Sequence, residues 1–371
     1  MRRVPHVRFR EDSHWLAAER AAGCCPVARI VYERYSAIGY RCCTAQLEGD
    51  RRHTPLRPVG GTRWTHSRLT NNSILTLVGD SMTEQAFVAL VCQAWREGFK
   101  LVHLASEMQS VNGTSWGEGS MWTARVRSPA TGASYVLHFI RANSVFAPED
   151  GGWLAKYRRA LPLLRTATVA IFGLGFNVAK AVSTAERLEQ QVRMLNQLRG
   201  RRPSVFLEYA ATHFPANASA GRCAATWWPE EENAAAAQRL NAALMHLVEA
   251  KVVGRIAPLF NLTRNRGDAH IGALTGVSHA GLATLKRRGV IAAFKRGLDC
   301  GHYCVQGGLL EAHALAVLRA IEMPEHWMGT DSATVMDPAE KAAAQVPPSP
   351  APRLPSNGSH TTIHGTMEHG T

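Results

Sequence analysis

The sequence predicts an α/β fold in which a mostly parallel sheet is flanked by helices. Short apolar runs of strand length recur along the chain, amphipathic helical patterns separate them, and the connections between them are short. With 371 residues and 46% hydrophobic composition the chain can bury a large core, and we expect one large domain rather than two.

The predicted elements alternate between strand and helix. The run Ile74 to Val78 is apolar apart from Thr76, which is typical of a buried parallel strand. A helix is expected after it, because apolar residues then recur at helical spacing: Phe87, Leu90, Val91, Ala94 and Trp95. Further strands are predicted at 102–105, 135–140, 167–172, 205–209 and 252–260.

Three more helices complete the pattern. One spans 184–200, where Leu188, Val192 and Leu195 share a face and Gly200 is a candidate C-cap. A second carries Leu240, Leu244 and Leu247 and is expected to begin at the acidic run 230–232, which suits the positive end of a helix dipole. The last covers 310–321.

Composition divides the chain into three parts. Residues 1–70 mix Arg, Cys and aromatic residues without a clear period, and an irregular lobe is expected there. The alternating pattern occupies 71–328. From 329 to 371 the chain contains the run Pro347 to Pro350 and a Ser/Gly/His/Thr-rich end, which predicts a disordered tail.

The net charge of +13 arises from 42 basic and 29 acidic residues. Either it is a solvated basic surface, or it serves an anionic partner such as an acidic glycan or a phosphate-bearing acyl donor. Nucleic acid is not an expected partner, because no zinc-finger spacing, RNP-like strand or basic zipper accompanies the charge.

Eight cysteines and five Asn-x-Ser/Thr sequons point to the secretory pathway. The sequons begin at Asn71, Asn112, Asn217, Asn261 and Asn357. The first residues show no apolar signal segment, and no run approaches the ~18 apolar residues of a membrane span. A membrane link is therefore expected only through an N-terminal anchor that this sequence does not show.

Ser81 is the candidate nucleophile. It follows Gly79 and Asp80 at the predicted turn from strand to helix, which exposes a hydroxyl at the carboxyl end of the sheet and directs helix N–H groups toward a developing oxyanion. Asp80 is expected to brace this turn by local hydrogen bonding.

The candidate base lies more than two hundred residues later, in the block Asp299 to Cys304. Asp299 precedes His302 by three residues, close enough for its carboxylate to orient an imidazole that deprotonates Ser81. Two other interpretations stay open: Cys300 and Cys304 form a local disulfide, or Asp, Cys and His side chains of the block bind zinc. The second lacks a further CxxC pair, and no metal site is predicted.

These blocks resemble those of the trichome-birefringence-like proteins, relatives of the sialate O-acetyltransferases with a PC-esterase (SGNH-like) domain. That family pairs Gly-Asp-Ser with Asp-Cys-x-His-Trp-Cys, and here Tyr303 replaces the Trp. Three further segments match in order over about residues 70–321: Cys92 eleven residues after the serine, Thr212-His213-Phe214 followed by Gly221-Arg222-Cys223, and Arg266-Gly267-Asp268-Ala269-His270.

The resemblance implies an SGNH-like three-layer catalytic domain over 71–328 that transfers acetyl groups to a polysaccharide through an acyl-enzyme. It implies an acetyl donor such as acetyl-CoA as co-substrate, no bound cofactor, a glycan acceptor and residence in the Golgi lumen. A carbohydrate acetylesterase and a non-enzymatic glycan-binding protein with a decayed site are the alternatives. In a secretory lumen we also expect Cys300 or Cys304 to be bonded to another cysteine, which would clamp the His302 loop, with Cys223 and Cys92 as other participants in disulfides.

The chain departs from the family in two places. Glu84 stands where the family has Arg, and Ile171 stands where the central block has Asn. The oxyanion hole is therefore expected to use the N–H groups of Ser81 and Gly173 and one amide, Asn177 or Gln85, with Glu84 pointing away from the pocket.

Other residues have competing interpretations. His213, Asp268 and His270 are predicted to support the site, or else to be ordinary structural hydrogen-bonding residues. Gly173-Leu174-Gly175 lacks the third glycine of a dinucleotide-binding loop, and no acid follows at the required place.

Overall fold

The computed structural model describes most of the predicted domain. The described residues are Cys25, Trp64, 69–107, 121–142, 160–173, 188–189, 192–193, 195–196, 200, 202–216, 223–230, 234–273, 298–303 and 309–324. Apart from Cys25, Trp64 and the last two residues, the predicted lobe at 1–70 lies outside them, as does the predicted tail at 329–371.

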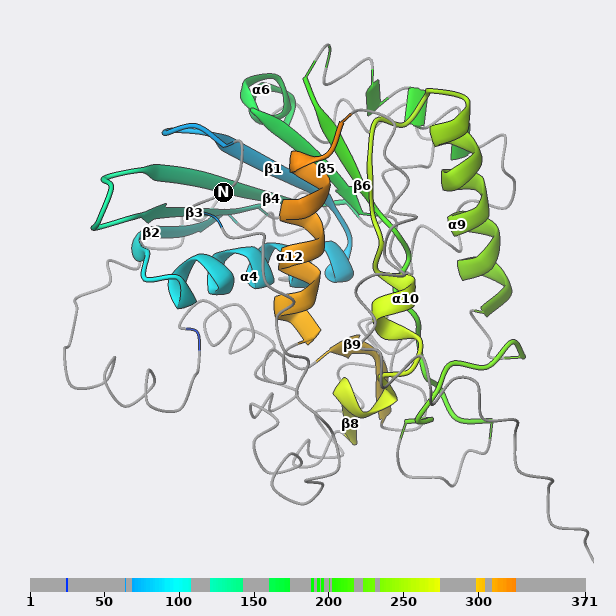
Figure 1. The fold of residues 1–371 in the computed structure, drawn as a ribbon. Coiled ribbons are helices and arrows are strands. Elements are labelled where there is room, and N and C mark those ends of the chain that lie inside the picture. The colour runs from blue at the N-terminus through cyan, green and yellow to red at the C-terminus, as the bar shows by residue number, and fades with distance from the viewer. Residues whose placement is uncertain are drawn as a thin grey trace, which may run out of the picture. The chain divides into compact units, whose positions relative to one another are not determined.

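A mixed, mostly parallel seven-stranded sheet forms the centre of the molecule, in the order β2-β3-β4-β1-β5-β6-β7. Its parallel part joins β4 (Ser134–Arg141), β1 (Ile74–Gly79), β5 (Val169–Gly173), β6 (Ser204–Leu207) and β7 (Ile256–Ala257). At the β4 edge, β3 (Met121–Arg127) and β2 (Lys100–Glu107) extend the sheet in antiparallel pairing. The α/β class is thus confirmed, and Figure 1 shows the sheet with its helices.

Helices pack on both faces of this sheet. The α4 (Ser81–Arg96) and α12 (Leu309–Glu322) helices share one core with inward residues of β1, such as Leu75 and Leu77. On the other face Leu164 of α6 (Ala160–Thr166) and Leu244 of α9 (Ala234–Glu249) lie in a second core with Val78. The alternation of side chains along β1 explains why one strand serves both cores.

Most predicted elements occur, with shifted ends. The described positions between 188 and 196 are helical with Leu188, Val192 and Leu195 buried, and Gly200 has a φ of 65° as expected at a helix end. The α9 helix begins at Ala234 with no acid in its first turn, so the acidic run precedes the helix.

The strand predicted at 252–260 was too long. Only Ile256 and Ala257 pair with the sheet, and Phe260 begins the short helix α10 (Phe260–Thr263). A single 3-10 turn η5 (Gly267–Ala269) follows.

His302 lies outside the main sheet. A separate two-stranded antiparallel sheet joins β8 (His270–Ala273) to β9 (Leu298–Tyr303), with His270 opposite Tyr303 and Gly272 opposite Asp299. In Figure 1 these two strands lie beyond the ends of α10 and α12. The predicted α/β pattern did not include this small sheet.

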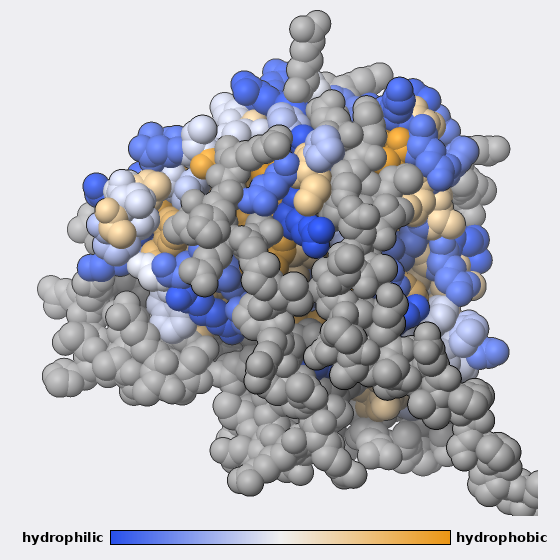
Figure 2. Space-filling view, in the orientation of Figure 1, coloured by the Kyte–Doolittle hydropathy of each residue, from blue (hydrophilic) through white to orange (hydrophobic). Residues whose placement is uncertain are grey.

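The described surface is largely hydrophilic in the view of Figure 2, where hydrophobic side chains appear as small separate areas. Among the described residues, the only large hydrophobic side chain that counts as exposed is Val102, at 51%. No helix of the described segments is long and apolar enough to cross a membrane.

Candidate active site

Ser81 is the first residue of α4 and follows directly on β1. Asp80 is the N-cap residue: its backbone is extended, and its carboxylate accepts a hydrogen bond from the N–H of Met82 at 2.9 Å. The carbonyl of Asp80 accepts the first helical bond, from Glu84 at 3.0 Å. The predicted bracing role of Asp80 is confirmed, and it places the serine hydroxyl at the positive end of a sixteen-residue helix.

Two glycines let the nucleophile turn approach the neighbouring strand. A Cβ at either Gly79 or Gly173 would overlap Oγ1 of Thr83, which is buried between them. Gly173 is therefore required for close packing of α4 against β5. Its predicted N–H contact to an oxyanion stays a prediction.

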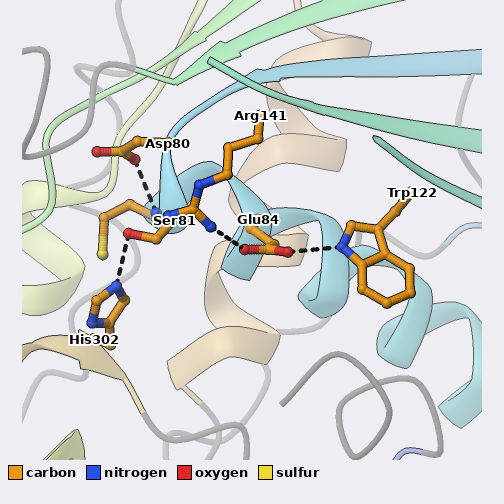
Figure 3. Close-up of polar contacts among 7 residues, drawn as sticks. Asp80, Ser81, Glu84, Trp122, Arg141 and His302 are labelled. Carbon is orange, nitrogen blue, oxygen red and sulfur yellow. Dashed lines mark hydrogen bonds and ion pairs between the residues drawn. The ribbon is translucent and has the colours of Figure 1, made fainter. Parts of the chain in front are cut away.

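The catalytic pair predicted from the sequence meets in the fold. Nε2 of His302 lies 2.8 Å from Oγ of Ser81, across 221 residues of chain. Figure 3 shows the imidazole of His302 directed at the hydroxyl of Ser81. The predicted convergence of these two side chains is confirmed, because a nitrogen at this distance can take the hydroxyl proton directly.

The strand that carries His302 is tied to the nucleophile helix by Gln85. Its Nε2 donates to the carbonyl of Tyr303 at 2.8 Å, and its Oε1 accepts from the N–H of Tyr303 at 3.1 Å. The side chain is 1% exposed. Gln85 was one of two amides predicted for the oxyanion hole, with Asn177, and here its oxygen and one N–H bind β9. The choice between the two amides stays a prediction, because Asn177 lies outside the described residues.

A disulfide holds the other end of β9. Cys300 is bonded to Cys223, and a second disulfide joins Cys25 to Cys92. The predicted participation of Cys300, Cys223 and Cys92 is confirmed, and a local Cys300–Cys304 bridge is ruled out because Cys300 has another partner. Disulfides are typical of an oxidising, secreted-type environment.

Two buried histidines lie behind His302. Nδ1 of His213 is 2.6 Å from Nε2 of His270, and Nδ1 of His270 is 3.0 Å from the carbonyl of His302. The ring of His270 stacks on that of Tyr303, with 4.3 Å between the centroids. Burial, reinforced by His213, lowers the pKa of His270 well below the ordinary value.

Tyr303 is a buried aromatic residue next to His302. Its ring is fully buried, and its hydroxyl donates to the carbonyl of Ala211. Burial raises the pKa of this phenol, so it stays protonated and acts as a hydrogen-bond donor. The polar end of this buried aromatic side chain is thus satisfied by a hydrogen bond.

The charge of Glu84 is compensated from a neighbouring strand. Its carboxylate pairs with Nη1 of Arg141 at 3.0 Å and accepts from Nε1 of Trp122 at 2.8 Å. Arg141 is the last residue of β4. It pairs with Gly79 of β1, and Gly79 lies two residues before Ser81. Figure 3 shows the carboxylate directed at these two partners and not at His302, as predicted. Sequence reasoning missed Arg141 and Trp122, and the only available signal was a basic residue at the end of a predicted strand.

Several predicted site residues are described in part or not at all. The backbone of Asp299 lies in β9, but its side chain is outside the described parts, as is that of Asp268. Asn177 and Cys304 lie wholly outside them. Ile171 is fully buried in the core, so this position could not present an amide to the site. Within the described segments, no cluster of three or more His, Cys, Asp or Glu side chains could hold a metal ion.

Comparison with known proteins gives no relative for this chain: no protein-family model matches it, and no curated protein is significantly similar. The geometry of the site therefore carries the functional argument. A serine at a helix N-terminus, with an imidazole nitrogen in hydrogen-bond contact, is an arrangement suited to nucleophilic catalysis.

Proposed function

We propose that this protein is a glycan O-acetyltransferase that works through an acetyl-serine intermediate on Ser81. The observation that carries the proposal is the 2.8 Å contact between Nε2 of His302 and Oγ of Ser81. It pairs a nucleophile with a base, and Ser81 lies at the carboxyl end of β1, where open α/β sheets bind ligands.

The first half-reaction forms the acyl-enzyme. Nε2 of His302 takes the hydroxyl proton as Oγ of Ser81 attacks the acetyl carbonyl carbon of the donor. The developing oxyanion is stabilised by the first N–H groups of α4 and by the helix dipole. As the bond between the acyl carbon and the donor group breaks, His302 returns its proton to the leaving group.

The second half-reaction regenerates the serine. A sugar hydroxyl enters, His302 takes its proton, and the hydroxyl oxygen attacks the acetyl carbon. Collapse of the intermediate breaks the ester bond to Oγ, which recovers the proton from His302. Asp299 is proposed to orient and charge-stabilise the imidazole throughout.

The acetyl donor, glycan acceptor and compartment rest on the resemblance to the trichome-birefringence-like proteins and their SGNH-like domain. The disulfides Cys223–Cys300 and Cys25–Cys92 support a lumenal location such as the Golgi. The two departures that suggest a decayed site have structural roles, which favours the enzyme proposal: Glu84 forms a buried ion pair and Ile171 packs in the core.

The deciding experiment is incubation of the purified full chain with a ¹⁴C-acetyl donor, followed by mass spectrometry of the modified peptide. We expect one acetyl group on Ser81 and none on Ser81→Ala. Ser73→Ala, a buried serine beside the start of β1, is the control and should label normally. Label that persists on Ser81→Ala would overturn the proposal.

A panel of glycans then separates transfer from hydrolysis. Label that moves from the acetyl-enzyme to a glycan supports the transferase. Label released as acetate at the same rate with and without glycan would identify a carbohydrate acetylesterase, in which water is the acceptor.

A further inference from the structure

Four imidazole nitrogens and two backbone carbonyls form one continuous row behind the base. Nε2 of His213 lies 3.0 Å from the carbonyl of Arg264 at one end. The two rings meet at 2.6 Å in the middle, and Nδ1 of His270 lies 3.0 Å from the carbonyl of His302 at the other end. Both rings are buried, with exposures of 0% and 2%.

Counting protons shows that this row is not satisfied by two neutral histidines. Each of the three contacts needs one proton, and carbonyl oxygens only accept, so both outer nitrogens must carry N–H groups. Two neutral imidazoles carry only two N–H groups between them. One contact would then bring two lone pairs together, and one additional proton completes all three hydrogen bonds.

One end of the row is the peptide group between His302 and Tyr303. The carbonyl of His302 faces His270, and the N–H of the same peptide group, on Tyr303, donates to Gln85 at 3.1 Å. That peptide is therefore held on both edges, once from β8 and once from α4. Its orientation fixes the direction in which the side chain of His302 leaves the backbone.

Among the described side chains, the titratable groups around the pair lie on β9 and α12. His302 and Tyr303 face it from β9, and His313 of α12 meets Tyr303 edge-on, with 5.5 Å between the ring centroids. His213 is further tied to β9 by its own N–H, which donates to the carbonyl of Cys300 at 3.0 Å. Burial opposes a charge on this pair, whereas the two carbonyls favour it.

We propose that His213 and His270 form a single proton-sharing unit that binds one proton between the two rings and, through Nδ1–H of His270, positions the catalytic His302. Both are positioning residues, because they act on the base and do not touch the reacting atoms. The effect on turnover rests on the proposed function, but the sharing of the proton does not.

The sharing is tested by ¹⁵N-histidine NMR on the full chain between pH 8 and pH 4. We expect the two rings to titrate together in one step of one proton, below the ordinary histidine pKa, with a strongly deshielded N–H signal for the central bond. Two separate steps, or no step in this range, would overturn the proposal. Neither measurement requires activity, so it also stands if Ser81 proves not to be a nucleophile.

The positioning is tested with two substitutions at one site. In His270→Asn the amide nitrogen replaces Nδ1 and still donates to the carbonyl of His302, whereas in His270→Gln it replaces Nε2 and contacts only His213. We expect His270→Gln to lose about tenfold in kcat with KM unchanged, and His270→Asn to lose less than threefold. Both variants should abolish the joint titration step. Equal losses in the two variants would show a merely structural role.

Discussion

The proposed nucleophile, Ser81, and the proposed base, His302, are held in place in different ways. Ser81 is positioned by its own neighbours in sequence, because β1, the Asp80 cap and α4 form one continuous strand-turn-helix unit. His302 lies on a strand outside the main sheet and is positioned by contacts from distant segments: Gln85, Cys223 and His270. One half of the site is thus local, and the other depends on the tertiary structure.

The largest expected effect comes from removing the disulfides one at a time. Cys223–Cys300 and Cys25–Cys92 close loops of similar length, with sequence separations of 77 and 67, so each double Cys→Ala variant should lose about 4 kcal/mol of unfolding free energy. Only the first bridge holds β9. We expect acetyl-enzyme formation to slow at least tenfold in Cys223→Ala/Cys300→Ala and to stay near normal in Cys25→Ala/Cys92→Ala, measured on protein shown to be folded.

Equal rates in the two variants would mean that the disulfide does not position the base. Denaturant unfolding of both proteins provides the stability comparison.

Acid should weaken the fold through the helix packed against β9. Burial lowers the pKa of His313 to about 4 from the ordinary 6.5. The folded state therefore favours the neutral ring. The contribution of His313 to the free energy of unfolding is fully present above pH 6.5. It is lost as the pH falls from 6.5 toward 4, by up to about 3 kcal/mol.

Urea unfolding at several pH values measures this slope. His313→Phe should reduce the slope between pH 6.5 and 4, whereas His246→Gln, which changes an exposed histidine in the last turn of α9, is the control. A curve that keeps its slope in His313→Phe would rule out this residue as the cause.

Removing the amide of Gln85 should separate the two halves of the site. Gln85→Met keeps the side-chain shape but leaves the buried N–H and carbonyl of Tyr303 without these partners, which costs roughly 2 kcal/mol. The rate of acetyl-enzyme formation should also fall. Gln93→Met is the matched control on the same helix, because Gln93 bonds Glu97 and not β9. A similar loss of rate in both variants would contradict the role of Gln85.

The smallest effect is expected at the locally determined turn. Asp80→Ala removes the N-cap contact to Met82 and should cost about 1 kcal/mol. Asp80→Asn keeps a capping oxygen and should recover most of that loss. Thermal unfolding of the three proteins distinguishes these outcomes, and a loss in Asp80→Ala as large as that in Gln85→Met would show that the turn also depends on distant contacts.

The sequence predicted the central sheet well where the strands are fully buried. Ile74–Gly79 and Val169–Gly173 are short, mainly apolar runs, as expected of strands that are buried on both faces. Two strands were not predicted correctly. The strand β3, in which buried residues alternate with more exposed ones, was missed, and β7, in which two residues pair, was predicted to span nine residues. Weak alternation and short pairing give little signal in one sequence.

The site divides in the same way. Ser81, Asp80 and His302 were predicted from two short blocks and from the resemblance of those blocks to a known family, and the cap of Asp80 and the contact of Ser81 with His302 are present. The contact of Gln85 with Tyr303 and the pairing of Glu84 with Arg141 were missed. Both depend on partners more than fifty residues away, and an amide or a carboxylate alone does not indicate which partner it will meet.

By itself, the sequence determined the strand-turn-helix unit around Ser81, because hydrophobic periodicity and a capping residue act over a few positions. Only the tertiary structure decided where β9 would lie, which cysteine Cys300 would join and which hydrogen bonds His213 and His270 would share. The physical reason is that these contacts require chain segments tens to hundreds of residues apart to meet, and such a meeting is set by the packing of the whole core and by no local pattern.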